Sequence, residues 1–249
     1  MKSIYLMTVL SWACFCCTAA LADDPDPQKV LNEAQTLASQ GKYEEALEKH
    51  LWFHENALKH SPSMRGVRLS FALSYWVELG HRYPKAREAL VAIRDKNTEA
   101  IREGRGFVDL FHDVASINGY LEEEEKTVEL FKTLDEKHHR LAERCYIVAE
   151  KDLAARREYT LCASYIPDAS ERFDRIKEMR ERQLSMAKDE RLRMKEYAEK
   201  SFVEVACRLI EILVGAGRKE DAESVRERAL AVRDDRKLRD AIEKVFRGG

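Results

Sequence analysis

Apolar residues recur along most of the chain at intervals of three and four, which is the spacing of one face of an α-helix. Two clear stripes precede glycines: Val30, Leu31, Ala34, Leu37 and Ala38 before Gly41, and Leu69, Ala72, Leu73, Trp76 and Leu79 before Gly80. Each stripe stops at its glycine, which tolerates the positive φ at which many helices end. The pattern predicts helices separated by tight turns.

A second helix is predicted to begin directly after each turn. Pro84 suits a first helical turn, because the N–H that proline lacks has no partner there. Acidic pairs at Glu44-Glu45 and Glu220-Asp221 place negative charge at the positive end of the helix dipole. A small residue follows in three copies: Ala46, Ala86 and Ala222. Each unit is therefore predicted to be a helix, a tight turn and an antiparallel helix.

The turn recurs along the chain. Copies are predicted near residues 41–44, 80–84, 119–122, 156–159 and 215–219. The aligned positions are Tyr43, Tyr83, Leu121, Tyr159 and Lys219, which are 40, 38, 38 and 60 residues apart. Spacing of this kind indicates one repeated structural unit.

Two stretches carry a resemblance to a known family. One is Ala34-x-x-Leu37-Ala38-x-x-Gly41-Lys42-Tyr43-Glu44-Glu45-Ala46-Leu47, and the other runs from Leu213 through Gly217 and Ala222 to Leu230. Both resemble tetratricopeptide repeats, although the spacing here exceeds that family's period of about 34 residues. The resemblance implies a right-handed α-solenoid of antiparallel helical hairpins with degenerate, slightly lengthened repeats. It also implies a scaffold or adaptor that binds another protein.

The longest interval between turns is rich in charge. Residues 170–214 contain no Gly or Pro, and Glu171/Arg175 and Glu178/Arg182 are i,i+4 pairs that support an exposed helix. We expect a charged helical arm over 170–200, inserted in the repeat array, with a break near Lys188-Asp189. A solvated helix face is the first interpretation, and a partner-binding or self-associating arm is the alternative. Apolar residues close the chain in a predicted capping helix: Leu238, Ala241, Ile242, Val245 and Phe246.

Composition supports a helical fold. The 249 residues are 35% charged and include only 5 Pro and 10 Gly, so signals for strands and loops are few. We therefore expect an all-α protein.

The first 22 residues differ from the rest. Lys2 precedes an apolar run from Ile4 to Cys17, and Ala20-Leu21-Ala22 follows. These are the features of a secretory signal peptide, and the run is too short to span a bilayer comfortably. We expect cleavage after Ala22, a single repeat domain over residues 23–249, and an exported protein, periplasmic or secreted, without a stable membrane span. An uncleaved anchor is the alternative.

Cleavage would leave 42 basic and 45 acidic residues, a net charge of −3. This balance gives no electrostatic basis for binding nucleic acid. Three cysteines would remain, Cys145, Cys162 and Cys207, none of them in a Cys-x-x-Cys pair. An odd number without such pairs argues against a disulfide framework or a zinc site, and favours small buried side chains.

Histidines are the first candidates for catalysis. His50 and His54 could share a helix face, with Glu55 and His60 nearby, but the His-Glu-x-x-His order of zinc hydrolases is absent. A lone pair fixes too few ligands for a metal, so packing or surface roles are favoured. His138-His139 gives a weaker signal still.

Other acid–base residues also have structural explanations. Phe111-His112-Asp113, with Asn118, contains suitable types, but neighbours in a helical sequence do not face one another. The four acids Glu122 to Glu125 fit the N-terminus of a helix. Neither nucleophile-elbow nor phosphate-loop spacing occurs.

Aromatic residues recur at helical intervals: Trp52, Phe53, Phe71, Tyr75 and Trp76. They could line a concave groove, but stacked hairpins must bury a continuous core, and core is the favoured interpretation.

We predict no catalytic, cofactor-binding or metal-binding residue and cannot assign partner-binding ones. The pattern and the resemblance together predict an exported, non-catalytic scaffold or adaptor of the cell envelope. Its partner would be a protein or peptide, with no cofactor, small-molecule substrate or nucleic acid. A self-assembling structural envelope protein and a metal-dependent hydrolase on a helical scaffold are the alternatives.

Overall fold

The structure, a computed structural model, describes residues 25–186, 192–234 and 236–248. Within these ranges the regular elements are α-helices and one short 3₁₀ turn, without a strand, which confirms the all-α prediction. The predicted signal peptide and the predicted break at Lys188-Asp189 lie outside the described residues. None of the described helices combines the length and the apolar character that crossing a bilayer requires.

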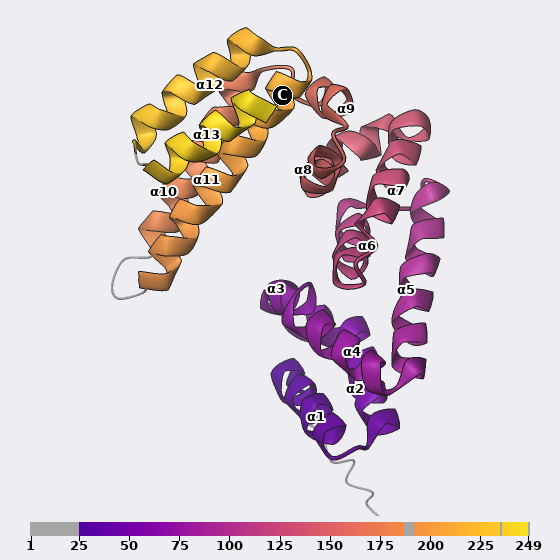
Figure 1. The fold of residues 1–249 in the computed structure, drawn as a ribbon. Coiled ribbons are helices and arrows are strands. Elements are labelled where there is room, and N and C mark those ends of the chain that lie inside the picture. Colours follow the sequence, from indigo (N-terminus) through magenta and orange to yellow (C-terminus); the bar gives the residue numbers. More distant parts are fainter. Residues whose placement is uncertain (1–24, 187–191, 235, 249) are drawn as a thin grey trace, which may run out of the picture. The chain divides into compact units, whose positions relative to one another are not determined.

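Contacts divide the chain into two compact units at the boundary between Arg65 and Gly66. In the N-terminal unit, α1 (Pro27–Ser39) packs against α2 (Tyr43–His60), and the 3₁₀ turn η1 (Pro62–Met64) follows (Figure 1). The side chain of Asp26 caps α1 by accepting a hydrogen bond of 2.9 Å from the Gln28 backbone N–H.

The C-terminal unit begins within the short helix α3 and, counting α3, contains eleven helices in the described residues. In chain order these are α3 (Arg65–Arg68), α4 (Phe71–Arg82), α5 (Pro84–Arg102), α6 (Val108–Tyr120), α7 (Glu124–Lys137), α8 (His139–Ala155), α9 (Tyr159–Ser164), α10 (Ala169–Met186), α11 (Leu192–Gly215), α12 (Lys219–Val232) and α13 (Arg236–Gly248). Contacts join α4 to α5, α7 to α8, α10 to α11 and α11 to both α12 and α13 (Figure 1).

Four helix junctions share one backbone geometry. A residue with positive φ follows the first helix: Gly41 (77°), Glu122 (59°), Arg157 (60°) and Gly217 (79°). The next residue donates its N–H to the carbonyl five positions earlier, at 2.8–3.1 Å, as in Lys42 to Leu37 and Arg218 to Leu213. This bond satisfies one of the carbonyls left open at a helix end. The second helix begins one residue later in these four cases. Gly104 (76°) ends α5 with the same bond, from the Arg105 N–H to the Ala100 carbonyl at 3.0 Å, but α6 begins only at Val108.

This geometry corrects the alignment of the turns made from the sequence. By backbone conformation the residue equivalent to Tyr43 in the third turn is Glu124, three positions after Leu121. Tyr83 is not equivalent either, because its backbone is extended (φ −135°, ψ 93°). Pro84 follows Tyr83, and the residue before a proline is driven out of the helical region.

Segment 170–200, predicted as a charged arm, contributes to the core. Phe173 and Ile176 of α10 are buried, as is Ala198 of α11, and the Phe173 and Phe202 rings meet edge to face with centroids 6.2 Å apart. α10 and α11 lie side by side (Figure 1). The two helices therefore pack against each other and bury part of their apolar residues between them.

The contact between α9 and α11 depends on a residue without a side chain. A Cβ atom at Gly215 would overlap the ring of Tyr159, whose hydroxyl donates a 2.8 Å hydrogen bond to Glu211. Gly215→Ala is therefore expected to displace the ring and lower the free energy of unfolding by about 1–2 kcal/mol, the cost of overpacking a close contact.

Chemical denaturation of the Gly215→Ala variant measures this cost. The double variant Gly215→Ala/Tyr159→Leu should recover part of the lost stability, because the smaller side chain makes room for the methyl group. A loss in the double variant equal to the sum of the losses in the two single variants would contradict the packing explanation.

Candidate functional site

The histidines considered for a metal site lie in the N-terminal unit. His50 is buried, and this burial lowers its pKa to about 4. The His60 ring stacks on Trp52 with centroids 5.4 Å apart, and His54 is half-buried. Among the described residues, no three His, Cys, Asp or Glu side chains come together in a way that could hold a metal ion.

His138 and His139 have separate surroundings. The Nε2 atom of His138 lies 3.1 Å from the Arg102 carbonyl oxygen. The Nδ1 atom of His139 lies 3.3 Å from Asp135, which also accepts a 2.5 Å hydrogen bond from the hydroxyl of Tyr165. The two neighbours in sequence therefore do not act on one centre.

The acid–base residues of α6 also have different partners. Asp113 forms an ion pair with Arg68, whereas Asn118 accepts a 3.0 Å hydrogen bond from Arg94 and donates one of 3.1 Å to Thr127. The structure thus places Asp113 and Asn118 in two separate networks.

Glu123 shows the role of the acidic run before α7. Its carboxylate accepts hydrogen bonds of 2.7 Å from Lys126 and 2.5 Å from Arg94, and these contacts lower its pKa to about 2. Arg94 is itself buried on α5. Glu123 therefore ties the start of α7 to α5 as an ionised partner of a buried arginine.

Burial raises the pKa of all three described cysteines, to about 11 for Cys145, about 12 for Cys162 and about 11 for Cys207. Their thiols are protonated near neutral pH, and the thiolate is the reactive form. They pack as small side chains, with Cys145 and Cys162 fully buried.

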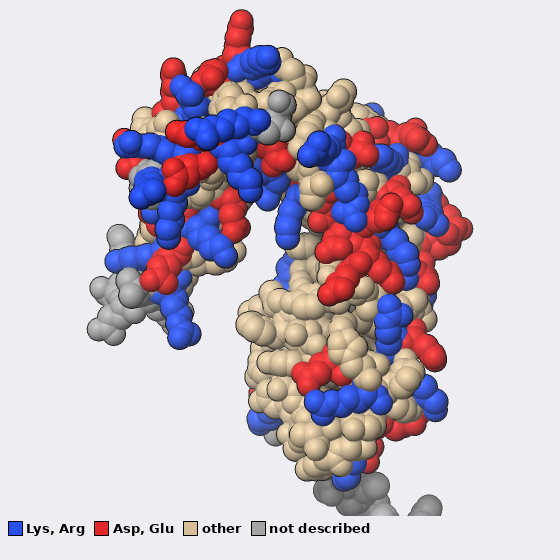
Figure 2. Space-filling model, viewed as in Figure 1, with Lys and Arg blue, Asp and Glu red and all other residues tan. Residues whose placement is uncertain are grey.

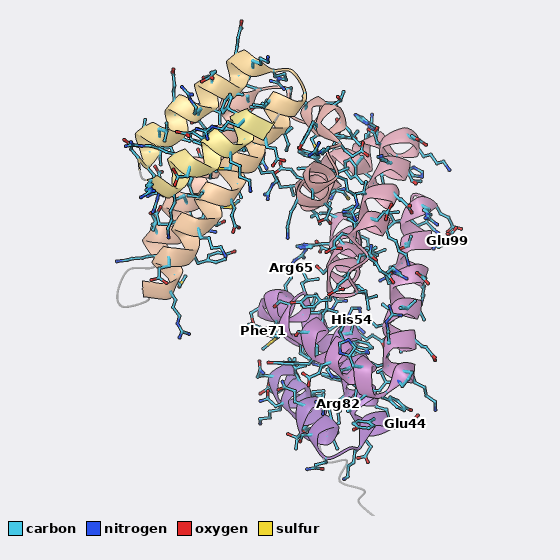
Figure 3. The ribbon with its side chains drawn as sticks, viewed as in Figure 1. Glu44, His54, Arg65, Phe71, Arg82 and Glu99 are labelled. Carbon is cyan, nitrogen blue, oxygen red and sulfur yellow. The ribbon has the colours of Figure 1, made fainter. Side chains whose placement is uncertain are left out.

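Of the aromatic candidates, Phe53 and Trp76 are buried, and the Trp76 indole N–H donates a 2.9 Å hydrogen bond to the Ala86 carbonyl. Trp52 and Tyr75 are half-buried. Phe71, the first residue of α4, is exposed and projects outward from the ribbon (Figure 3).

A site that the sequence did not indicate lies among α8, α10 and α11, which we name the α8–α10–α11 groove. It encloses about 110 Å³. It is lined by Ile147, Glu150, Arg172, Arg175, Ile176, Met179, Arg180, Gln183, Ser201, Phe202, Val205 and Arg208. All three helices belong to the C-terminal unit.

The floor of the groove is fixed by an ion triad. Glu150 of α8, only 2% exposed, accepts hydrogen bonds of 2.6 Å from Arg172 of α10 and 3.0 Å from Arg208 of α11. One carboxylate thereby connects three helices. The Nε atom of Arg172 is buried without a hydrogen bond among the described residues. This triad holds the groove walls at a defined separation.

The rim of the groove exposes large apolar side chains. Ile147 of α8 is 55% exposed and Met179 of α10 is 52% exposed. Phe202 of α11 also lines the groove and is buried, with the Arg180 guanidinium 5.5 Å from its ring centroid. Exposed apolar side chains around a pocket are a feature of binding surfaces.

Arginine dominates the charge of the groove. Beyond the triad, Arg180 and Arg233 share Glu199 at 2.6 and 2.5 Å, and Arg175 pairs with Glu171 at 2.5 Å. Basic and acidic side chains are interspersed over α10 to α13 in the view of Figure 2. In the triad one glutamate serves two arginines, so one positive charge there is left without a carboxylate partner.

The chain matches no protein-family model, and no curated protein or solved structure matches it either.

Proposed function

We propose that this protein is a non-catalytic scaffold or adaptor that binds a protein or peptide partner through the α8–α10–α11 groove. The observation that carries the proposal is the pairing of two exposed apolar side chains, Ile147 and Met179, with a floor fixed by Glu150. Exposing such side chains to water is unfavourable, and covering them by a partner recovers this free energy. Arg and Met are also enriched at protein interfaces.

The repeat architecture is part of the proposal. The hydrogen bond shared by four helix junctions supports a series of degenerate tetratricopeptide-like hairpins, closed by α13 as a capping helix. We propose that these hairpins form a right-handed solenoid. In such arrays the binding surface spans several repeats, as the groove spans α8, α10 and α11.

We also propose that the protein is exported. The basic start at Lys2, the short apolar run and Ala20-Leu21-Ala22 support cleavage after Ala22 and a place in the cell envelope, periplasmic or secreted.

Isolation of the tagged full-length protein from its native host tests the binding function. Wild type is compared with Ile147→Glu and Met179→Glu, and with Phe107→Glu as control, because Phe107 is 53% exposed and lies outside the groove. We expect a stoichiometric partner with wild type and with the control, and its loss from both groove variants. Equal recovery in all four samples would contradict binding through the groove.

Self-assembly is the second candidate function. Met179 and Met186 are exposed on one face of α10, seven residues apart, and could contact another copy. Light scattering of wild type and Met179→Glu distinguishes the candidates. A wild-type oligomer that Met179→Glu dissociates favours self-assembly, whereas a monomer in both samples favours the adaptor.

A further inference from the structure

We infer that the partner segment recognised by the α8–α10–α11 groove is an acidic amphipathic helix that inserts one apolar side chain between Ile147 and Met179. This inference rests on the proposed function and adds the chemistry of the partner.

The charge of the groove favours a partner segment that carries acidic residues. Four lining residues are arginines and one is a glutamate. Arg175 and Arg180 have acidic partners of their own outside the lining, so the surplus of positive charge lies at the triad. The lining glutamate, Glu150, is already used by Arg172 and Arg208, so it cannot neutralise both. Carboxylates on a partner would complement the remaining positive charge, and they accept two parallel hydrogen bonds from a guanidinium. A basic partner would instead face like charge.

The size of the groove matches one apolar side chain. Its volume of about 110 Å³ is somewhat below the roughly 150 Å³ of an engineered protein cavity that binds benzene. Ile176, Phe202 and Val205 provide apolar walls, and Met179 can adapt its flexible thioether to the shape of an incoming residue. A side chain of the size of leucine is therefore the expected central anchor.

The shape of the surface favours a helical partner. Lining residues on α10 extend from Arg172 to Gln183, a span of twelve residues and about 17 Å of helix, which is roughly three turns. An amphipathic helix that lays its apolar face in an apolar groove is a recurring mode of peptide recognition. Such a helix presents apolar residues on one face and acids on its flanks.

Fluorescence anisotropy with the full chain tests the inference. The probe is a labelled peptide of about four helical turns with leucine on one face and glutamate elsewhere. A second peptide carries lysine in place of glutamate, and a third carries a central proline, which breaks the helix. We expect the acidic helical peptide to bind at least about tenfold more tightly than either of the others, a difference of about 1.4 kcal/mol.

Matched variants locate the binding. Met179→Glu should weaken binding of the acidic peptide by about tenfold or more, whereas Phe107→Glu leaves it unchanged. Arg175→Glu should also weaken it, while Arg82→Glu is the control, because both arginines belong to exposed i,i+4 ion pairs and only Arg175 lines the groove. Thermal unfolding by circular dichroism checks that each variant is folded.

The outcomes separate the two proposals. Equal affinity for all peptides, preference for lysine, or losses in the control variants would overturn the acidic-helix inference. If no peptide binds but recovery of the partner from the host still depends on Met179, the acidic-helix inference fails and the adaptor function stands. If no peptide binds and no partner depends on the groove, both proposals fail.

Discussion

Replacing Glu150 by glutamine is expected to lower the free energy of unfolding by about 2–3 kcal/mol. The neutral amide would leave Arg172 and Arg208 facing each other without the carboxylate that now joins them. Removing one partner of a buried ion pair costs about 3–5 kcal/mol, because a buried charge loses its compensation. The effect here is smaller, since the Arg172 and Arg208 side chains are 14% and 23% exposed and retain some hydration.

Urea denaturation at neutral pH, followed by circular dichroism, measures the Glu150 effect. Glu171→Gln is the matched control, because Glu171 also pairs with an arginine on α10, but both side chains of that pair are exposed. The control should change stability by no more than about 0.5 kcal/mol. Similar losses in the two variants would show that Glu150 contributes no more than a surface ion pair.

Acidification is expected to destabilise the N-terminal unit through His50. Burial holds the pKa of His50 near 4, below its ordinary value of 6.5, so the folded state favours the neutral ring. Between these values the unfolded chain binds a proton that the folded chain does not, and stability falls as pH falls. Stability should be fully present above about pH 6.5 and decline by about 3 kcal/mol by about pH 4, at roughly 1.4 kcal/mol per pKa unit.

Denaturation curves collected across this pH range test the role of His50. His50→Gln should flatten the pH dependence whatever its effect on absolute stability, since glutamine does not titrate in this range. His60→Gln is the control, because His60 lies on the same helix and is exposed. An unchanged slope in His50→Gln, or a flattened one in His60→Gln, would assign the pH dependence to other groups.

The apolar stripes could be predicted because a helix that buries one face carries apolar residues at every third or fourth position. In α4, the predicted residues Ala72, Leu73, Trp76 and Leu79 are all buried. α1 likewise buries Val30, Leu31 and Ala34. The spacing of three and four residues alone carries this information.

The positions of the turns were only partly visible in the sequence. Gly41 and Gly217 indicated their turns because glycine favours positive φ. Glu122 and Arg157 adopt the same conformation with side chains that give no such signal, and this displaced the third copy by three residues. The same hydrogen bond forms at both kinds of turn, so the repeat lies in the backbone more than in the residue types.

The groove could not be predicted because its residues are distant in sequence. Glu150 is 22 residues from Arg172 and 58 from Arg208, and no spacing in the sequence relates the three residues. Only the packing of α8 against α10 and α11 buries them together. The one available signal was the presence of Ile147 and Met179 among charged neighbours.

Site-specific photo-crosslinking in the native host tests the central claim most directly. A photoreactive amino acid replaces Met179 in one strain and Phe107 in another, and both positions are exposed in the folded chain. Binding through the α8–α10–α11 groove predicts one discrete cross-linked product from position 179 and none from position 107. A product from position 107 alone, or none from either position, would contradict it.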